Sequence, residues 1–270
     1  MLIKNVFTFL IGCCFGSFIN VIIYRLPLGQ SIVFPGSHCP ECTYEIRWYQ
    51  NIPIISWILL KGRCIKCNQK ISIMYPIIEL LIGILFVLNN YSLNSRLSIA
   101  PQAITTVYGW IFISILITMA ILDMKYLWLP EIISKLGIIF SILCSFLFQI
   151  RFENLNTNFL IIETILATSL GYLIFKSISA IGFSIYKKPA MGKGDAKLAA
   201  LLGSWLGLKG LLISIWLAFF FAGIFGIIGL MLRKIKKDQK IPFGSFLSLS
   251  GLFVWYLGNN FISDLILLGI

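Results

Sequence analysis

Three long stretches of this 270-residue chain contain no charged residue, and they constrain the fold more than any other feature. These stretches are Leu97–Leu122, Leu211–Leu232 and Ile241–Ser263. Each is long enough to cross about 30 Å of hydrocarbon as an α-helix. Because 59% of the residues are hydrophobic and only 12% are charged, an ordinary soluble domain is excluded. The sequence therefore predicts a protein that crosses a membrane several times.

Similar apolar runs recur along the whole chain, separated by short polar segments. No alternating strand pattern accompanies them, so we predict an all-α polytopic membrane protein with about eight transmembrane helices. The expected spans are residues 5–24, 72–90, 102–123, 131–150, 159–186, 198–208, 211–232 and 243–263. The sixth of these is short for a crossing, so it either crosses with help from its neighbours or is replaced by a re-entrant element.

The placement of the 22 basic residues predicts how the chain is oriented. With the N-terminus outside, most of them fall in cytoplasmic segments, above all in residues 25–71 and Arg233–Lys240. Basic loops stay on the cytoplasmic side of a bilayer, so this distribution explains the net charge of +12 without nucleic acid as a partner. It also places Asp123 and Asp195 at the cytoplasmic ends of their helices, on one membrane face.

Asp123 and Asp195 border apolar runs in opposite halves of a chain that has only ten acidic residues. A carboxylate at membrane depth is costly, so both are functional candidates. Two carboxylates that share one proton hydrolyse peptide bonds: the ionised one activates water, and the protonated one bonds the scissile carbonyl. The sequence does not assign these two roles. Gly192 and Gly194 allow positive φ, and we expect them to let an extended substrate backbone approach Asp195.

The alternative for both aspartates is an ion pair at the membrane interface. Asp123 lies near Lys125 in the sequence, and Asp195 lies between Lys193 and Lys197. Under this alternative, neither carboxylate has a chemical role.

Four of the seven cysteines form two C-x-x-C pairs, Cys39 with Cys42 and Cys64 with Cys67. Reduced thiols at this spacing in a cytoplasmic segment favour a tetrahedral Zn²⁺ site. Because four cysteines fill the coordination shell, we expect the zinc to be structural. A redox dithiol and an iron site are the alternatives. His38, the only histidine, is expected to be a bystander.

A set of short motifs occurs in a fixed order over nearly the whole chain. The motifs are Gly16–Val21, Tyr24–Pro27, Gly36–Cys42, Trp48–Pro53, Ser56–Trp57, Gly62–Cys67, Tyr75–Glu79, Asp123 with Leu129–Glu131, Gly192–Leu198 and Ile241–Gly244. Each is weak alone, but together they resemble the bacterial prepilin peptidases, the type IV leader peptidases of the GxGD intramembrane aspartyl protease family. Two positions depart from the usual pattern: Glu131 replaces aspartate, and Ser245 replaces proline. We expect little effect from either.

The resemblance implies that the chain removes the basic leader from type IV prepilin and pseudopilin precursors at the cytoplasmic face of the bacterial inner membrane. Asp123 and Asp195 match the catalytic pair of the family. Members with the cysteine-bearing segment also methylate the new N-terminal amine with S-adenosylmethionine. Glu79 is our candidate for this second reaction, because a carboxylate can orient an amine and accept its proton. A structural hydrogen bond is the alternative for Glu79.

These interpretations divide the chain into three parts. Residues 1–24 form the first transmembrane helix, residues 25–71 a cytoplasmic zinc-knuckle insertion between the first two helices, and residues 72–270 a transmembrane aspartyl peptidase domain. The expected partners are pilin precursors and membrane lipid, and the oligomeric state is left open. Two alternatives remain: a peptidase alone, with the zinc segment as a substrate clamp, or a non-catalytic membrane scaffold or transporter.

Overall fold

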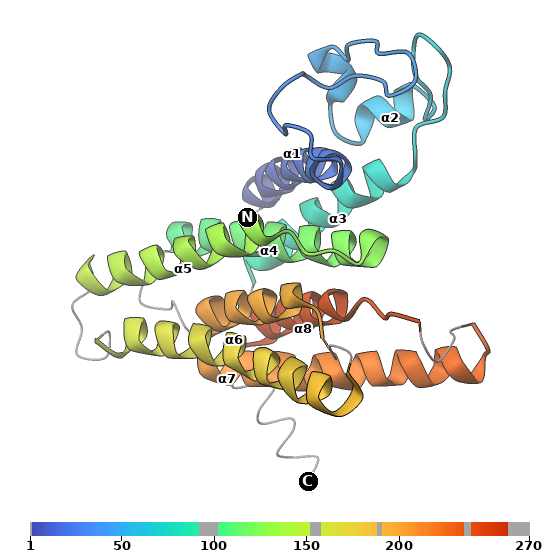
Figure 1. Cartoon of the computed structure of the whole chain (residues 1–270). Coiled ribbons are helices and arrows are strands. Elements are labelled where there is room, and N and C mark those ends of the chain that lie inside the picture. The colour runs from blue at the N-terminus through green and yellow to red at the C-terminus, as the bar shows by residue number, and fades with distance from the viewer. Residues whose placement is uncertain (1, 92–101, 152–157, 188–190, 235–238, 259–270) are drawn as a thin grey trace. The chain divides into compact units, whose positions relative to one another are not determined.

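The computed structural model describes residues 2–91, 102–151, 158–187, 191–234 and 239–258, and its regular elements in these ranges are all helices (Figure 1). The chain divides into two compact units, Met1–Tyr91 and Ser92–Ile270. Within the described ranges, five helices are long and apolar enough to cross a membrane, and two apolar helices are shorter. The predicted all-helical membrane fold is confirmed, whereas the count of eight spans and the division into three parts stay predictions.

The first unit is built on a close pair of helices, α1 (Leu2–Arg25) and α3 (Met74–Asn89). Glycines allow the contact. A Cβ on Gly12 would lie 2.7 Å from the Gly83 Cα, and a Cβ on Gly16 would lie 2.6 Å from the Glu79 Cα. Small residues one turn apart let two helix backbones approach and pack through van der Waals contact. This contact places the buried Glu79 beside α1.

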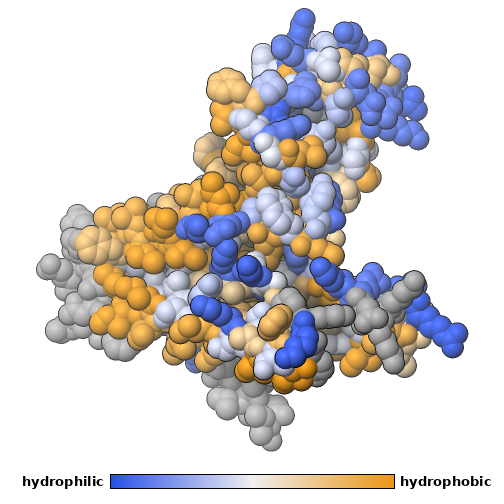
Figure 2. Space-filling view, in the orientation of Figure 1, coloured by the Kyte–Doolittle hydropathy of each residue, from blue (hydrophilic) through white to orange (hydrophobic). Residues whose placement is uncertain are grey.

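The segment between α1 and α3 is mostly irregular. Its short helices are η1 (Leu26–Leu28), η2 (Trp48–Asn51) and α2 (Ile55–Leu59). The buried Arg25 anchors its start, because the guanidinium donates hydrogen bonds to the carbonyls of Ser31, Pro35 and Gly36. Figure 2 shows that hydrophilic residues gather over this segment. Such a surface fits a segment that lies in water rather than in lipid.

The second unit is arranged around one long helix. Its helices are α4 (Gln102–Tyr126), α5 (Glu131–Arg151), α6 (Asn158–Tyr186), α7 (Lys193–Met231) and α8 (Phe243–Leu257). Helix α7 packs against α5, α6 and α8, while α4 packs mainly against α8. Trp205 of α7 is fully buried: it stacks on Phe112 with ring centroids 4.8 Å apart, and its indole N–H donates to the Gly137 carbonyl.

Helix α7 is broken at Gly207, where φ is 73° and ψ is −175°, a conformation that favours glycine. The break reverses the chain. Gly194, before the break, contacts Leu129, and Leu129 also contacts the start of α8. Phe219, after the break, lies at this same end, with its ring centroid 5.0 Å from that of Phe243. The weak sixth segment and the seventh segment of the sequence are therefore the two arms of one helical hairpin.

The packing of the hairpin against α6 gives a test of the fold. A Cβ on Gly203 would collide with the Ala167 carbonyl of α6. We expect Gly203→Ala to lower the free energy of unfolding by about 1–3 kcal/mol, as overpacking does. Gly223→Ala in the same helix is the matched control, because a Cβ there meets no atom within 4 Å. Thermal unfolding in detergent measures both variants, and equal melting temperatures would contradict the packing.

Candidate active site and metal centre

Asp123 forms hydrogen bonds with the first turn of a neighbouring helix. It lies in the last turn of α4, is only 6% exposed, and meets the first turn of α8. Its Oδ2 accepts hydrogen bonds from the Ser245 N–H at 2.8 Å, from the Ser245 hydroxyl at 3.2 Å, and from the Gly244 backbone. The first N–H groups of a helix have no partner within the helix, and they carry a partial positive charge. The N-terminus of α8 therefore supplies the donors that a buried carboxylate needs.

Asp195 has a similar environment, made by its own helix. It lies in the first turn of α7 and is 9% exposed. Its Oδ2 accepts a hydrogen bond from the Gly192 N–H at 3.0 Å, and its own N–H lies 3.2 Å from the Gly192 carbonyl oxygen. This reciprocal arrangement caps α7 and fixes the direction of the side chain.

Leu129 brings the two helix starts together. A Cβ on Gly194 would lie 2.8 Å from the Leu129 Cβ, and a Cβ on Gly244 would lie 2.7 Å from the Leu129 Cδ1. The N-termini of α7 and α8 therefore converge on one side chain. Asp123 and Asp195 are near enough for the charge of one to act on the other. The structure thus brings together the two aspartates that the sequence singles out, although their catalytic roles stay predictions.

The two glycines before Asp195 leave space that neighbouring side chains occupy. Gly192 is extended, with φ of −70°, and Gly194 is not among the residues with positive φ. Neither glycine uses the positive φ that it allows, and the role of both toward the substrate stays a prediction. Gly194 lacks a side chain because Leu129 fills that space, and a Cβ on Gly192 would lie 3.2 Å from the Asp195 Oδ2. The absence of a side chain at these two positions therefore leaves room for Leu129 and for the Asp195 carboxylate.

A short ion-pair network holds the start of α7 against the start of α5. The Glu131 Oε1 lies 2.7 Å from the Lys197 Nζ and 3.0 Å from the Lys135 Nζ. Lys197 is thus engaged by Glu131, which argues against its being the partner of Asp195. The long side chain of Glu131, in place of the expected aspartate, still reaches both lysines.

The sequence does not identify Ser245 as part of the site. The resemblance leads one to expect proline there, and a proline would offer neither an N–H nor a hydroxyl. Ser245 therefore gives Asp123 a backbone donor that proline would lack, and its hydroxyl lies 2.9 Å from the Ala120 carbonyl and 3.2 Å from the Asp123 Oδ2, so the substitution changes the surroundings of Asp123 directly. The only sequence signal is a hydroxyl residue at a helix start, where serine side chains commonly form hydrogen bonds.

The four predicted cysteines form one cluster, with all Sγ atoms within 4.8 Å of one another. The Sγ atoms of Cys39 and Cys67 are 3.8 Å apart, and those of Cys42 and Cys64 are 4.0 Å apart. Tetrahedral Zn²⁺ with Zn–S bonds of about 2.3 Å requires S–S separations of about 3.8 Å, so the cluster fits zinc. Backbone N–H groups of Cys67 and Lys66 lower the pKa of the Cys64 thiol to about 7, whereas the other thiols of the cluster raise the pKa of Cys67, so Cys64 is the thiol that ionises more readily.

Each cysteine pair forms the same turn. The Cys39 N–H donates to the Tyr44 carbonyl, and the Cys39 carbonyl accepts from the Thr43 N–H. Cys64 repeats both bonds in the second pair, and the equivalent residues Thr43 and Asn68 both have φ of 55°. Two such turns that face one another form the expected pair of knuckles. The ring of His38 bonds instead to the Gly36 carbonyl, as expected of a bystander.

Glu79 lies in α3 and is 7% exposed. Its Oε2 accepts a hydrogen bond of 2.7 Å from the Ile54 N–H, and the Ser17 hydroxyl also bonds to this carboxylate. The structural hydrogen bond that was the alternative for Glu79 is therefore present. A role in amine methylation is compatible with it and stays a prediction.

Comparison with known protein families covers most of the chain. Residues 10–93 match the bacterial peptidase A24 N-terminal domain, and residues 110–227 match the type IV leader peptidase family. This chain belongs to the type IV leader peptidase family. The two matches place the cysteine cluster and Glu79 in the N-terminal domain of the family, and both aspartates in its peptidase domain.

Relatives named prepilin leader peptidase/N-methyltransferase are similar over most of the chain. The Neisseria gonorrhoeae protein is 30% identical over 93% of this chain and 89% of its own length. The Klebsiella pneumoniae protein is 37% identical over 76% of this chain and 86% of its own length. The Myxococcus xanthus protein is 33% identical over 84% of this chain, which spans 63% of that relative. No solved structure matches the chain significantly.

The cysteine cluster predicts a metal content. We expect the purified protein to hold about one Zn²⁺ per chain, because four thiolates close a tetrahedral site. Cys39→Ser removes one ligand and is expected to lower the zinc content severely, as measured by plasma mass spectrometry. Cys144→Ser in α5, outside the cluster, is the matched control. Wild-type protein purified without chelators that contains no zinc would contradict the assignment.

Proposed function

We propose that this protein removes the leader peptide from type IV prepilins and pseudopilins and then methylates the new N-terminal amine. The names of the similar proteins support both activities. The observation that carries the first activity is the pair of buried aspartates, Asp123 and Asp195, at two helix N-termini that both contact Leu129. Such a pair provides a general base for the attacking water and a general acid for the scissile carbonyl and the leaving amine.

The proposed hydrolysis uses one proton shared between the two aspartates, because like charges held close together do not both ionise. The ionised carboxylate takes a proton from water as the water oxygen bonds to the scissile carbonyl carbon. The protonated carboxyl hydrogen-bonds the carbonyl oxygen. The C–N bond then breaks, and the leaving amine takes a proton from the pair. The pair acts as a unit, so neither aspartate is assigned alone to one role.

The donors around each carboxylate suit this chemistry. Donors at the helix N-termini stabilise the ionised member, and in the described part of the chain neither aspartate forms an ion pair with a lysine. Gly192 and Gly194 keep the approach to Asp195 free of side chains, which favours an extended substrate segment. A helical substrate would have to unwind there, and its freed amide groups would need partners from the protein because lipid offers none.

The location in the cell follows from the charge pattern. The chain is a multi-pass membrane protein, and we place it in the bacterial inner membrane with its N-terminus outside and the aspartate pair at the cytoplasmic face. Residues 25–71 would then form a cytoplasmic domain around a structural zinc, between the helix of residues 1–24 and the peptidase part within residues 72–270. The unequal distribution of basic residues supports this orientation.

Replacement of either aspartate tests the assignment. We expect Asp123→Asn and Asp195→Asn to leave the protein folded but to slow leader removal by more than about 100-fold, because each variant loses a shared-proton partner. Co-expression with a prepilin, followed by mass spectrometry of the pilin N-terminus, measures the effect. The matched control is Glu41→Gln, at an exposed position in the segment between α1 and α3. Normal processing in either aspartate variant would refute the pair.

The same measurement on the wild-type chain separates the alternatives. A shortened pilin with one added methyl group supports both activities. A shortened pilin without the methyl group supports a peptidase alone, with the zinc segment as a clamp. An intact precursor, with folded protein present in the membrane, would favour a scaffold or transporter.

A further inference from the structure

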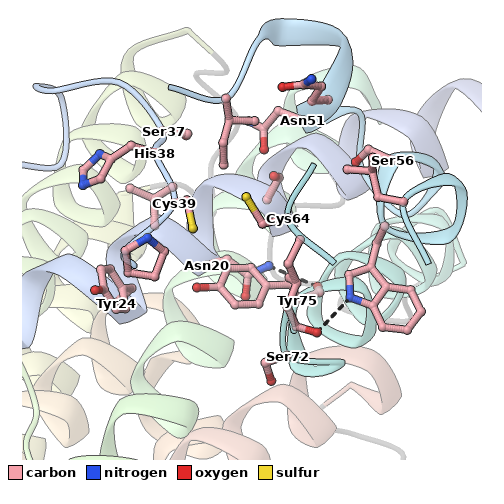
Figure 3. A pocket seen from close by; sticks show the side chains of 18 of the residues that line it. Asn20, Tyr24, Ser37, His38, Cys39, Asn51, Ser56, Cys64, Ser72 and Tyr75 are labelled. Carbon is pink, nitrogen blue, oxygen red and sulfur yellow. Dashed lines mark hydrogen bonds between the residues drawn. The ribbon is translucent and has the colours of Figure 1, made fainter. Parts of the chain in front are cut away.

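The first unit contains a cavity of about 260 Å³ that the peptidase chemistry does not use (Figure 3). Its walls come from the end of α1, the start of α3 and the segment between them. Figure 3 shows Asn20 and Tyr24 of α1, Tyr75 of α3, and the sulfur atoms of Cys39 and Cys64 around this space. The helix pair and the cysteine-bearing segment therefore build the cavity together.

Glu79 is the only carboxylate among the residues that line this cavity. It forms hydrogen bonds, but none of the lysines or arginines in the described part of the chain forms an ion pair with it. Arg25 and Lys70 also line the cavity, but the Arg25 guanidinium is engaged by three backbone carbonyls and Lys70 is exposed. A buried carboxylate without a cationic partner makes the cavity suited to a ligand that brings a positive charge.

The donor that holds Glu79 comes from a strained turn. Ile54 has φ of 62° and ψ of −53°, and the N–H of Ile55 donates to the Pro53 carbonyl across it at 2.6 Å. This is a γ-turn of the rare form, and it is costly for a β-branched residue. The turn directs the Ile54 N–H at the Glu79 carboxylate. Such strain persists where the surroundings enforce it, and it is concentrated at binding and catalytic sites.

Aromatic side chains form much of the remaining wall. Tyr24, Tyr44, Tyr75 and Trp57 all line the cavity. The indole N–H of Trp57 donates to the Ile71 carbonyl at 3.2 Å, which fixes the plane of the ring. Aromatic faces attract onium cations and stack on flat heterocycles. A carboxylate among aromatic rings thus suits a ligand that combines a cationic centre with an aromatic base.

We propose that this cavity binds the methyl donor S-adenosylmethionine, with its sulfonium beside Glu79 and its adenine among the aromatic rings. The inference rests on the methyltransferase part of the proposed function. Bound there, the donor supplies the methyl group. Glu79 orients the cationic centre, Trp57 presents an aromatic face to the base, and the Ile54 N–H holds the carboxylate in place.

Binding of two stable analogues to the purified full-length protein in nanodiscs tests the proposal. Sinefungin carries a positive amine where S-adenosylhomocysteine carries a neutral sulfur, so only sinefungin gains from a carboxylate at this point. We expect Glu79→Gln, measured by calorimetry, to weaken sinefungin binding about tenfold and to change S-adenosylhomocysteine binding much less. Glu45→Gln, at an exposed site in the same unit, is the matched control. Equal losses for both analogues, or no loss for either, would overturn the proposal.

A second pair of variants tests the aromatic wall. Trp57→Phe is expected to weaken both analogues to a similar extent, because it alters contact with the base that they share. Trp48→Phe is the control, since Trp48 is 82% exposed and does not line the cavity. Indistinguishable affinities of these two variants for both analogues would count against the placement of the base.

Ultraviolet cross-linking of radiolabelled S-adenosylmethionine to the wild-type protein provides a readout that does not depend on the folding of any variant. The label is expected in peptides that contain Trp57 or Tyr75, and labelling confined to the second unit would overturn the proposal. Leader removal is measured on the same preparation. Binding without leader removal would contradict the peptidase assignment alone, whereas leader removal without binding by the wild-type protein would contradict this site alone.

Discussion

A carboxylate inside a helical membrane protein is stable only where the protein itself supplies hydrogen-bond donors, because hydrocarbon supplies none. In this chain Asp123 accepts from the first turn of α8, and Asp195 accepts from the N–H of Gly192, the residue just before α7. N–H groups in a first turn have no partner within their own helix, so their use breaks no helical hydrogen bond. Placing both aspartates at helix starts therefore gives the carboxylates hydrogen-bond donors and gives the unpaired N–H groups acceptors.

That requirement explains the break at Gly207. An unbroken helix of the length of α7, 39 residues, would extend about 58 Å, nearly twice the hydrocarbon thickness of about 30 Å. It would also carry the chain away from the end where Asp195 lies. The left-handed conformation of Gly207 instead turns the chain back, and Phe219 returns to the level of Phe243. Helix α8 can then begin beside α7, with its free N–H groups at Asp123.

Local patterns in the sequence were sufficient to predict the helical membrane class, the four-cysteine cluster and the two aspartates that meet at Leu129. The surroundings of these residues were not predictable in the same way. Ser245 lies 122 positions from Asp123, and Leu129 contacts two glycines in separate helices, so both contacts exist only after packing. Gly194 shows the limit of a local argument: its missing side chain is explained by a neighbour distant in sequence, and its own φ is ordinary.

The same distinction applies to Glu79. From the sequence it is a carboxylate without an obvious partner, whereas the structure gives it a donor from a strained turn at Ile54. This turn lies between the two cysteine pairs, on a stretch whose ends are Cys42 and Cys64. Their Sγ atoms are 4.0 Å apart, so a metal at the cluster would close this stretch into a loop. Closing a loop removes conformational freedom from the unfolded chain and helps to offset the cost of the strained turn. A metal at the cluster would thereby help to set the position of the N–H that holds Glu79.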